Sequence, residues 1–235
     1  MKNIILKSKK DPFGFLARAL YKTTIGRLKY GSGANYDAAR YWRDRFSKYH
    51  LSLQGAGDEG LSEEDNWRMY GQARDVFTEV CQQENINFQL ANVLEIGCGT
   101  GFYTQLFYDL GVNSYLGVDI TDVLFTDLKH KFPNFTFIKK DVTVDKLEGQ
   151  FDLIVMIDVI EHIVEKTKLS FALENIRNCL SNEGRFIVAP IASESKKHLF
   201  YVHSWSLADL KPNFTECSFR ELVPFRNDYI LVIKK

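Results

Sequence analysis

The segment VLEIGCGTGF, residues 93–102, is a short apolar run that ends in closely spaced glycines. Those glycines are Gly97, Gly99 and Gly101. A main chain without Cβ atoms can turn tightly from strand to helix and lets a ligand approach it closely. A dinucleotide fingerprint would need a third glycine where Phe102 stands, so no pyrophosphate site is indicated. Glu95, two residues before the first glycine, instead suits a ligand with a positively charged group, such as an amino acid ammonium.

Acidic residues stand at the ends of the apolar segments that follow this turn. Asp119 lies in YLGVDIT, Asp141 lies in FTFIKKDVT, and FDLIVMIDVIEHI brings Ile157 and Asp158 to the equivalent position. An acid at 119 can accept both hydroxyls of a ribose, and one at 141 can accept a hydrogen bond from the exocyclic amine of an adenine. Because the carboxyl ends of parallel strands meet at one edge of a sheet, these residues predict a shared binding crevice.

Asp158, Glu161 and His162 are spaced i, i+3 and i+4, which places them on one face if a helix begins near 158. His162 could then act as a general base that removes the proton of a hydroxyl acceptor. A divalent metal held by the three groups, with His198 or His203 as a further ligand, is an alternative that we do not favour. Packing of His162 inside the fold is the third interpretation, and the sequence leaves all three open.

Short apolar runs alternate with helical periods from residue 92 onward, which predicts a mostly parallel sheet with helices on both faces. Strands are expected at 92–96, 114–119, 136–139, 152–157 and 185–190, followed by a hairpin of 217–224 and 228–234. Helices are expected near 101–110, 122–131, 160–163 and 166–180, and at 205–211 behind a Ser204 cap. Upstream, Ser62 and the acids that follow it predict the start of a long helix.

Together these motifs resemble the class I S-adenosylmethionine-dependent methyltransferases. The resemblance rests on VLEIGCGTG, GVDIT, KKDVT, FDLIVMIDVIEHI and CLSNEGRFIVAP, and it covers the middle of the chain closely. It implies an α/β, Rossmann-like fold with a seven-stranded, mostly parallel sheet whose last strand is antiparallel. It also implies S-adenosylmethionine as the methyl donor, with the methionine moiety at Glu95 and Gly97, the ribose at Asp119, and the adenine at Asp141 and Val142. We expect the same crevice to include Cys98, Gly99, Gly101, Ile120 and Ile157.

The methyl acceptor is less specified than the donor. We expect an O-methyltransferase acting on a small molecule or glycan, with His162, Glu161 and Asp158 as catalytic residues. Residues that flank the core, where similar enzymes often place a lid, are Tyr36, Trp42, Arg43, Arg45, Tyr70 and the segment HLFYVHSWS at 198–206. The alternatives are a nucleic-acid or peptide methyltransferase, a non-catalytic protein that binds S-adenosylmethionine, and an NAD-dependent oxidoreductase. The first lacks support because IDVI stands where an amino-directed nucleic-acid enzyme would carry Asn/Asp-Pro-Pro-Tyr/Phe.

Length and composition fit a single α/β domain with additions, since the chain has 235 residues, 45% of them apolar and 26% charged. No run of 18 apolar residues predicts a transmembrane helix, and the N-terminus lacks the apolar region of a signal peptide. Four cysteines without a CxxC pair favour a reduced, cytoplasmic protein.

Residues 1–35 carry eight Lys and Arg against one Asp, a net charge of +7 that the remaining residues balance at −7. This charge suits contact with a membrane surface, a nucleic acid (which we do not favour) or an acidic partner. The alternative is a solvated extension that packs on the acidic remainder of the same chain.

We therefore divide the chain into three parts. Residues 1–35 form a basic N-terminal arm ending in a GSG hinge, residues 36–90 form a helical lid, and residues 91–235 form the catalytic domain that binds S-adenosylmethionine. We expect the arm to be an appendage, so that a chain beginning near Asn35 still folds.

Overall fold

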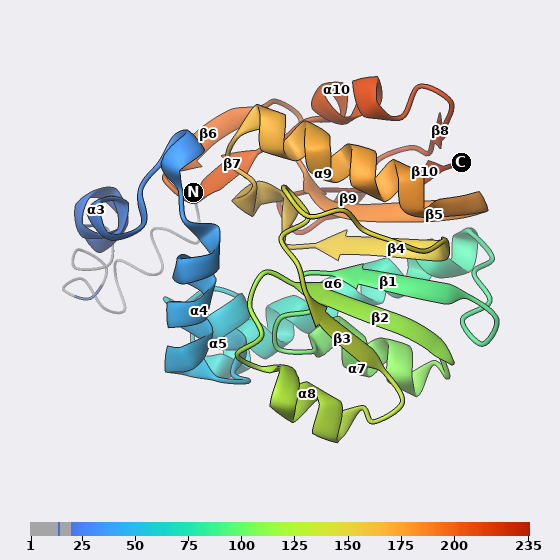
Figure 1. The fold of residues 1–235 in the computed structure, drawn as a ribbon, viewed down its shortest axis with the longest axis horizontal. Helices are drawn as coiled ribbons and strands as arrows, with labels where there is room; N and C mark the ends of the chain where they lie inside the picture. Colours follow the sequence, from blue (N-terminus) through green and yellow to red (C-terminus); the bar gives the residue numbers. More distant parts are fainter. Residues whose placement is uncertain (1–13, 15–19) are drawn as a thin grey trace.

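The computed structural model describes residue 14 and residues 20–235 and has a central sheet with helices on both faces (Figure 1). The strands of this sheet are β1 (Asn92–Ile96), β2 (Ser114–Asp119), β3 (Thr136–Lys139), β4 (Phe151–Ile157), β5 (Leu180–Ile191), β8 (Ser218–Phe219), β9 (Val223–Phe225) and β10 (Asp228–Lys234). Their order is β3-β2-β1-β4-β5-β10-β8, and β9 also pairs with β10. The first five strands are parallel, whereas β10 runs antiparallel to β5, β8 and β9.

The predicted mostly parallel sheet with an antiparallel last strand is confirmed. Its outer position holds two short strands in place of the single strand expected at 217–224, and the Arg220 N–H donates to the Val232 carbonyl at 3.0 Å in the gap between them. Counted as one interrupted strand, β8 and β9 give the expected seven positions. The inner strands read as continuous apolar runs because helices cover both of their faces; in β4 only Asp152 is exposed.

Each face of the sheet has its own apolar core. On one face pack α6 (Glu63–Gln83), α7 (Phe102–Asp109) and α8 (Phe125–Lys131), and on the other α9 (Lys166–Cys179) and α10 (Leu207–Leu210) (Figure 1). Phe77, Phe107 and Leu128 fill the first core, and Leu173 and Leu210 belong to the second. Helices therefore fix the sheet from both sides and leave its edge of strand ends for the site.

Two helix starts were predicted from capping residues, and one of them is confirmed. The Ser62 hydroxyl accepts from the Asp65 N–H at 3.1 Å, and acids fill the first turn of α6, as expected. The cap predicted at Ser204 is wrong, because the chain still runs in a strand there. Ser206 caps α10 instead and forms a reciprocal capping box with Asp209.

A third, aromatic cluster holds the N-terminal segment against the rest of the molecule. It joins α3 (Gly26–Tyr30) and α4 (Ala38–Tyr49) to a small hairpin of β6 (Lys196–Leu199) and β7 (Val202–Ser204). Tyr30 stacks on Phe200 with ring centroids 6.2 Å apart, and Tyr41 stacks on Tyr201 at 4.9 Å. These contacts place α4 beside the carboxyl ends of the parallel strands (Figure 1).

Most of the predicted basic arm, residues 1–13 and 15–19, lies outside the described residues. The boundaries at 35 and 90 stay predictions. Between residues 20 and 235, no helix is both long enough and apolar enough to cross a membrane.

Candidate functional site

The glycine turn connects β1 to α7. Three of its residues have a positive φ: Gly97, Gly99 and Gly101. The Gly97 N–H donates to the Val118 carbonyl at 2.7 Å, which fastens the turn to β2. A Cβ at position 97 would lie 2.2 Å from a Val159 methyl, and one at 101 would lie 2.5 Å from Leu128. Both glycines are therefore required by packing as well as by the backbone angle. A Cβ at position 99 would make an ordinary contact with the Phe46 ring, at 3.5 Å.

Asp119, at the end of β2, is held by the main chain. One carboxylate oxygen accepts from the Gly99 N–H and the other from the Thr121 N–H, both at 3.0 Å. Each oxygen keeps a second lone pair, so the carboxylate can accept two more hydrogen bonds. Burial raises the pKa of Asp119 to about 6, against the partial compensation of these backbone donors.

Glu95, inside β1, is buried and has two hydroxyl donors. Tyr115 donates to its Oε2 at 2.5 Å and Thr104 donates to the same oxygen at 2.9 Å. Desolvation raises the pKa of Glu95 to about 7, although both hydroxyls favour the charged form. The residue thus connects β1, β2 and α7 beneath the glycine turn, with Oε1 outside this internal pair of bonds.

Asp141 follows β3 and closes a tight turn. Its Oδ1 accepts from the Thr143 N–H at 2.9 Å and from the Thr143 hydroxyl at 2.6 Å. The next part of the loop is fixed from α9, where the Asn175 amide donates to the carbonyls of Val142 and Asp145 at 3.1 and 2.8 Å. Asn175 is buried, and no motif or spacing in the sequence indicated its role.

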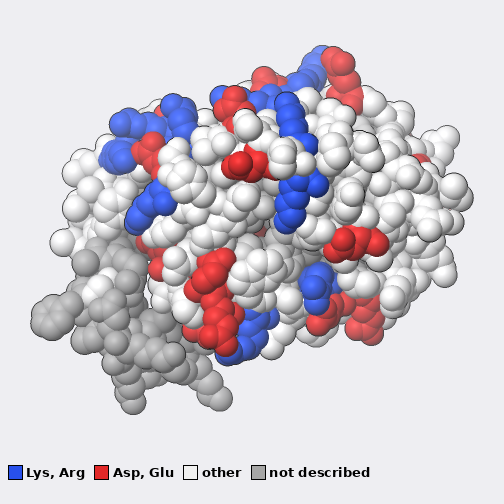
Figure 2. Space-filling view, turned by 90° about the horizontal axis from the view of Figure 1, so that it is seen from below, with Lys and Arg blue, Asp and Glu red and all other residues white. Residues whose placement is uncertain are grey.

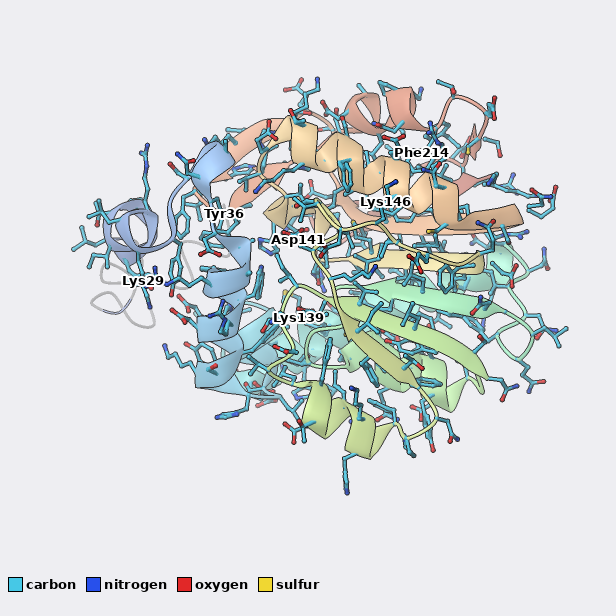
Figure 3. The ribbon with its side chains drawn as sticks, in the orientation of Figure 1. Lys29, Tyr36, Lys139, Asp141, Lys146 and Phe214 are labelled. Atoms are coloured by element: carbon cyan, nitrogen blue, oxygen red, sulfur yellow. The ribbon has the colours of Figure 1, made fainter. Side chains whose placement is uncertain are left out.

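One cavity of about 270 Å³ runs along these strand ends and beneath α4. Of the predicted site residues, it is lined by Glu95, Gly97, Cys98, Gly99, Asp119, Ile120, Asp141, Val142, Ile157, Asp158 and His162. Tyr36 and Asp141, both labelled in Figure 3, lie at this end of the sheet, one before α4 and the other after β3. Gly101 and Glu161 do not line it. Gly101 instead begins α7 in a left-handed conformation.

The condition that a helix begin near 158 is not met, and the helix expected near 160–163 is a single 3₁₀ turn. Asp158 has a φ of +58°, and only a short 3₁₀ turn, η3 (Ile160–His162), follows it. Asp158 and His162 therefore reach the cavity, while Glu161 turns away from it. Burial, and then the nearby Asp158 charge, raise the pKa of Glu161 well above its usual range. Its Oε2 is buried and has no hydrogen-bond partner among residues 20–235.

Asp158 is held by Arg226, from the turn between β9 and β10. The guanidinium lies 2.6 Å from Oδ1 of Asp158 and sits over the Tyr70 ring at 4.9 Å from its centroid. The other carboxylate oxygen, Oδ2, is buried and unpaired within the described part of the chain. No sequence signal pointed to Arg226, which stands 68 positions from its partner.

His162 has a defined tautomer. Its Nδ1 lies 2.9 Å from the Tyr201 carbonyl, which can only accept, so Nδ1 carries the proton and Nε2 holds the lone pair. The ring meets Trp42 edge to face at 4.9 Å and stacks on Tyr201 at 5.9 Å. Burial lowers the pKa of His162 to about 4, so the imidazole is neutral at physiological pH.

The predicted lid residues divide into two groups. Tyr36, Trp42 and Tyr70 line the cavity, whereas Arg43 and Arg45 do not. The Arg45 guanidinium is instead occupied by the Tyr41 hydroxyl and by carbonyls of the α5 (Leu53–Ala56) region. Three further aromatic residues line the cavity and were not predicted from the sequence: Phe46, Phe102 and Tyr103. The position of Phe102 and Tyr103 directly after the glycine turn could have indicated the last two.

The metal alternative finds no ligand set in the described residues, where no group of three or more His, Cys, Asp or Glu side chains is arranged to hold an ion. His198 instead contacts the Ser204 hydroxyl at 2.8 Å, and His203 stacks on Trp205 with centroids 3.8 Å apart.

Part of the chain is similar to known proteins. Residues 94–186 match the family described as methyltransferase domain. Nodulation protein S of Azorhizobium caulinodans is 32% identical over 100 residues, which are 42% of this chain and 48% of that protein. The chain therefore matches about half the length of this curated relative.

Two solved structures share the fold at low sequence identity. Magnesium protoporphyrin IX methyltransferase from Synechocystis PCC 6803, with bound S-adenosylhomocysteine, aligns with a TM-score of 0.64 at 17% identity over 83% of this chain and 99% of that one. The N-methyltransferase NodS from Bradyrhizobium japonicum WM9, in complex with S-adenosylhomocysteine, aligns with a TM-score of 0.58 at 17% identity over 81% and 96%.

The matched segment contains the glycine turn, both acids that follow it and the acid–imidazole turn after β4. Residues 94–186 thus match the methyltransferase domain family, and the strand order is that of a fold shared with two solved S-adenosylhomocysteine-bound methyltransferases.

Proposed function

We propose that this chain transfers the methyl group of S-adenosylmethionine to a hydroxyl group of a small molecule or glycan. One observation carries the proposal: a single cavity contains the backbone-held carboxylate of Asp119, the glycine turn and the neutral imidazole of His162. A donor-binding end and a proton-accepting group thus share one enclosed space, which is what a transfer reaction between two bound molecules needs.

The residues at the donor end fit S-adenosylmethionine, which when bound supplies an electrophilic methyl group on a sulfonium. Asp119 retains two acceptor positions for the ribose hydroxyls, because its backbone donors use only one lone pair of each oxygen. Gly99 lines the cavity without a side chain, so a ligand can approach the main chain there. Val142 offers an apolar wall whose position is fixed through Asn175.

At the acceptor end, His162 is the proposed base. Its Nε2 lone pair would accept the hydroxyl proton as the oxygen bonds to the methyl carbon, so the imidazole becomes positively charged. The carbon–sulfur bond breaks in the same displacement, its electron pair goes to the sulfur, and S-adenosylhomocysteine leaves. The Tyr201 carbonyl, which accepts from Nδ1–H, fixes the ring for this role and stabilises the charge that forms. Trp42 and Tyr70 exclude water and provide flat apolar surfaces for a ring-shaped acceptor.

An amino acceptor is the second candidate, and one observation favours it. Oδ2 of Asp158 is a buried carboxylate oxygen beside the cavity that lacks a partner in residues 20–235, and it could accept from an N–H group. One of the similar structures is an N-methyltransferase by name. In this version Asp158 orients the amine and His162 accepts the proton that the nitrogen loses.

The first test is donor binding measured by calorimetry. S-adenosylhomocysteine should bind, and NAD and NADP should not; nicotinamide dinucleotide binding without a response to S-adenosylhomocysteine would refute the proposal.

The second test incubates the protein with labelled S-adenosylmethionine and separate pools of glycans, small metabolites, peptides and RNA, and identifies the methylated atom by mass spectrometry. The two acceptor types also differ in pH dependence, because an amine must lose a proton before it can attack and its rate rises through its own pKa.

A further inference from the structure

We infer that the outward face of the helical segment 20–30 docks on an anionic phospholipid surface. Three large apolar side chains project from this segment into solvent: Leu20 is 58% exposed, Ile25 is 52% exposed and Leu28 is 88% exposed. Elsewhere in the described chain, exposed apolar side chains of this size stand singly along the sequence, as Leu90 does before β1. A cluster on one short helix marks a contact surface.

The opposite face of the segment anchors it to the protein. Gly26 packs so tightly that a Cβ would lie 2.8 Å from the Phe200 ring, and Tyr30 is buried against the same ring. The Tyr30 hydroxyl also donates to Asp44 of α4 at 2.9 Å. α3 lies at the edge of the molecule beyond α4 (Figure 1). Because the anchored face is fixed, the exposed apolar side chains stay on the solvent side.

Basic groups border the apolar residues. Arg27 and Arg40 are exposed, and the Arg40 guanidinium donates to the Lys29 carbonyl at 3.3 Å, next to the helix end. The first 35 residues carry a net charge of +7, whereas the remaining residues carry −7. On the face shown in Figure 2, by contrast, positive and negative side chains are interspersed. The positive charge is thus concentrated in the part of the chain that contains the exposed apolar helix.

An anionic bilayer fits both properties of this surface. Helices that lie in a membrane interface combine apolar side chains on one side with Lys and Arg at the border, and the basic groups are attracted to anionic lipid headgroups. A nucleic acid would use the charge and leave the three apolar side chains in water. A second copy of the chain would cover the apolar side chains and bring two basic segments together.

Docking in this way would orient the proposed active site. The residues that follow the helix, Gly33, Tyr36 and Asp37, line the donor cavity. A membrane bound at 20–30 would therefore lie close to the entrance of the cavity, within reach of an acceptor at the bilayer surface. The docking itself does not depend on the proposed methyl transfer.

The test is flotation of the full chain with vesicles of phosphatidylcholine alone and of phosphatidylcholine mixed with phosphatidylserine. We expect binding to the mixed vesicles only, and we expect Leu28→Glu to reduce the bound fraction at least tenfold. Leu90→Glu is the matched control, because Leu90 is 82% exposed at the opposite, amino end of β1 and should bind like the unmodified chain. Unchanged melting temperatures would show that both variants fold.

Three outcomes would overturn the inference. Absence of binding to the mixed vesicles at low salt excludes the membrane surface. Vesicle binding that Leu28→Glu leaves unchanged assigns the attraction to charge outside the apolar face. A dimer in light scattering that Leu28→Glu dissociates, or binding of a short RNA without vesicle binding, assigns the surface to a second copy or to nucleic acid.

Discussion

The end of the cavity proposed to bind the donor and the end proposed to bind the acceptor, called here the donor half and the acceptor half, are held together in different ways. In the donor half, Asp119 and Asp141 accept hydrogen bonds from main-chain N–H groups within a few residues or on the neighbouring turn. In the acceptor half, Asp158 depends on the side chain of Arg226, and His162 depends on the carbonyl of Tyr201, 39 positions away. Main-chain donors nearby in the chain come with the strand order. Asp158 instead requires an arginine at a remote position, and His162 requires the β6–β7 hairpin to lie beside it.

This contrast indicates that the acceptor half can change while the donor half keeps its geometry. Because the donor half is set by glycines and strand ends, its geometry persists as long as the sheet forms. The acceptor half is assembled from α4, the turn after β4, the β6–β7 hairpin and the β9–β10 turn, so substitutions in any of them can alter the acceptor. The following predictions test whether the two halves can be disabled separately.

The largest effect is expected from His162→Ala. Loss of the base should reduce turnover on the order of 10²–10⁴-fold, while the dissociation constant for S-adenosylhomocysteine stays within about twofold. Turnover and calorimetric binding measure the two quantities. His198→Ala, an exposed imidazole on β6, is the control and should retain both. A His162→Ala enzyme with normal turnover would assign this residue to packing.

Asp119→Ala should disable the donor half with little direct effect on the acceptor. Two hydrogen bonds to a carboxylate would be lost, which corresponds to about 2–4 kcal/mol of donor binding free energy. Calorimetry with S-adenosylhomocysteine gives the value. The matched control is Asp122→Ala, because Asp122 is exposed, pairs with Lys139 at 3.1 Å and does not line the cavity. Equal donor affinity in both variants would contradict the proposed ribose contact.

Lowering the pH should weaken donor binding about tenfold without a matching step in turnover from His162. Ribose hydroxyls donate to the ionised form of Asp119, whose pKa is raised to about 6, so donor affinity should fall as the pH falls below 6, about tenfold at pH 5. Asp119→Asn should remove this component and leave only the titration of Glu95, near pH 7. His162, with a pKa lowered to about 4, stays neutral from pH 5 to 8 and should give no step in turnover there.

Arg226→Lys should have a smaller effect, confined to the acceptor half. Lysine keeps the positive charge beside Asp158 but loses the planar guanidinium that lies over Tyr70. The KM for the acceptor should rise about fivefold, corresponding to the roughly 1 kcal/mol of a cation–π contact, while donor affinity is unchanged. A matching loss of donor affinity would show that the two halves are not independent.

The sequence could predict the donor half because its determinants are local. A glycine turn after an apolar strand and an acid at the next strand end are visible within short windows, and parallel strands bring their carboxyl ends together. The acceptor half depends on contacts between distant segments, such as Asp158 with Arg226. The shared helical face considered for Asp158, Glu161 and His162 does not form, for a physical reason. The Asp158 N–H donates to the Ala189 carbonyl at 2.9 Å, and a φ of +58° then turns the chain. Spacing alone could not reveal that conformation.

The contact between Gly97 and Val159 bears on the order in which the two substrates load. Val159 packs against the donor turn and lines the cavity, and Phe46 of α4 faces Gly99 from above. A donor bound along the turn would lie beneath α4, and an acceptor placed beside His162 would lie between that donor and the entrance. We therefore expect sequential addition with S-adenosylmethionine first and S-adenosylhomocysteine leaving last, so that S-adenosylhomocysteine inhibits competitively against the donor and noncompetitively against the acceptor.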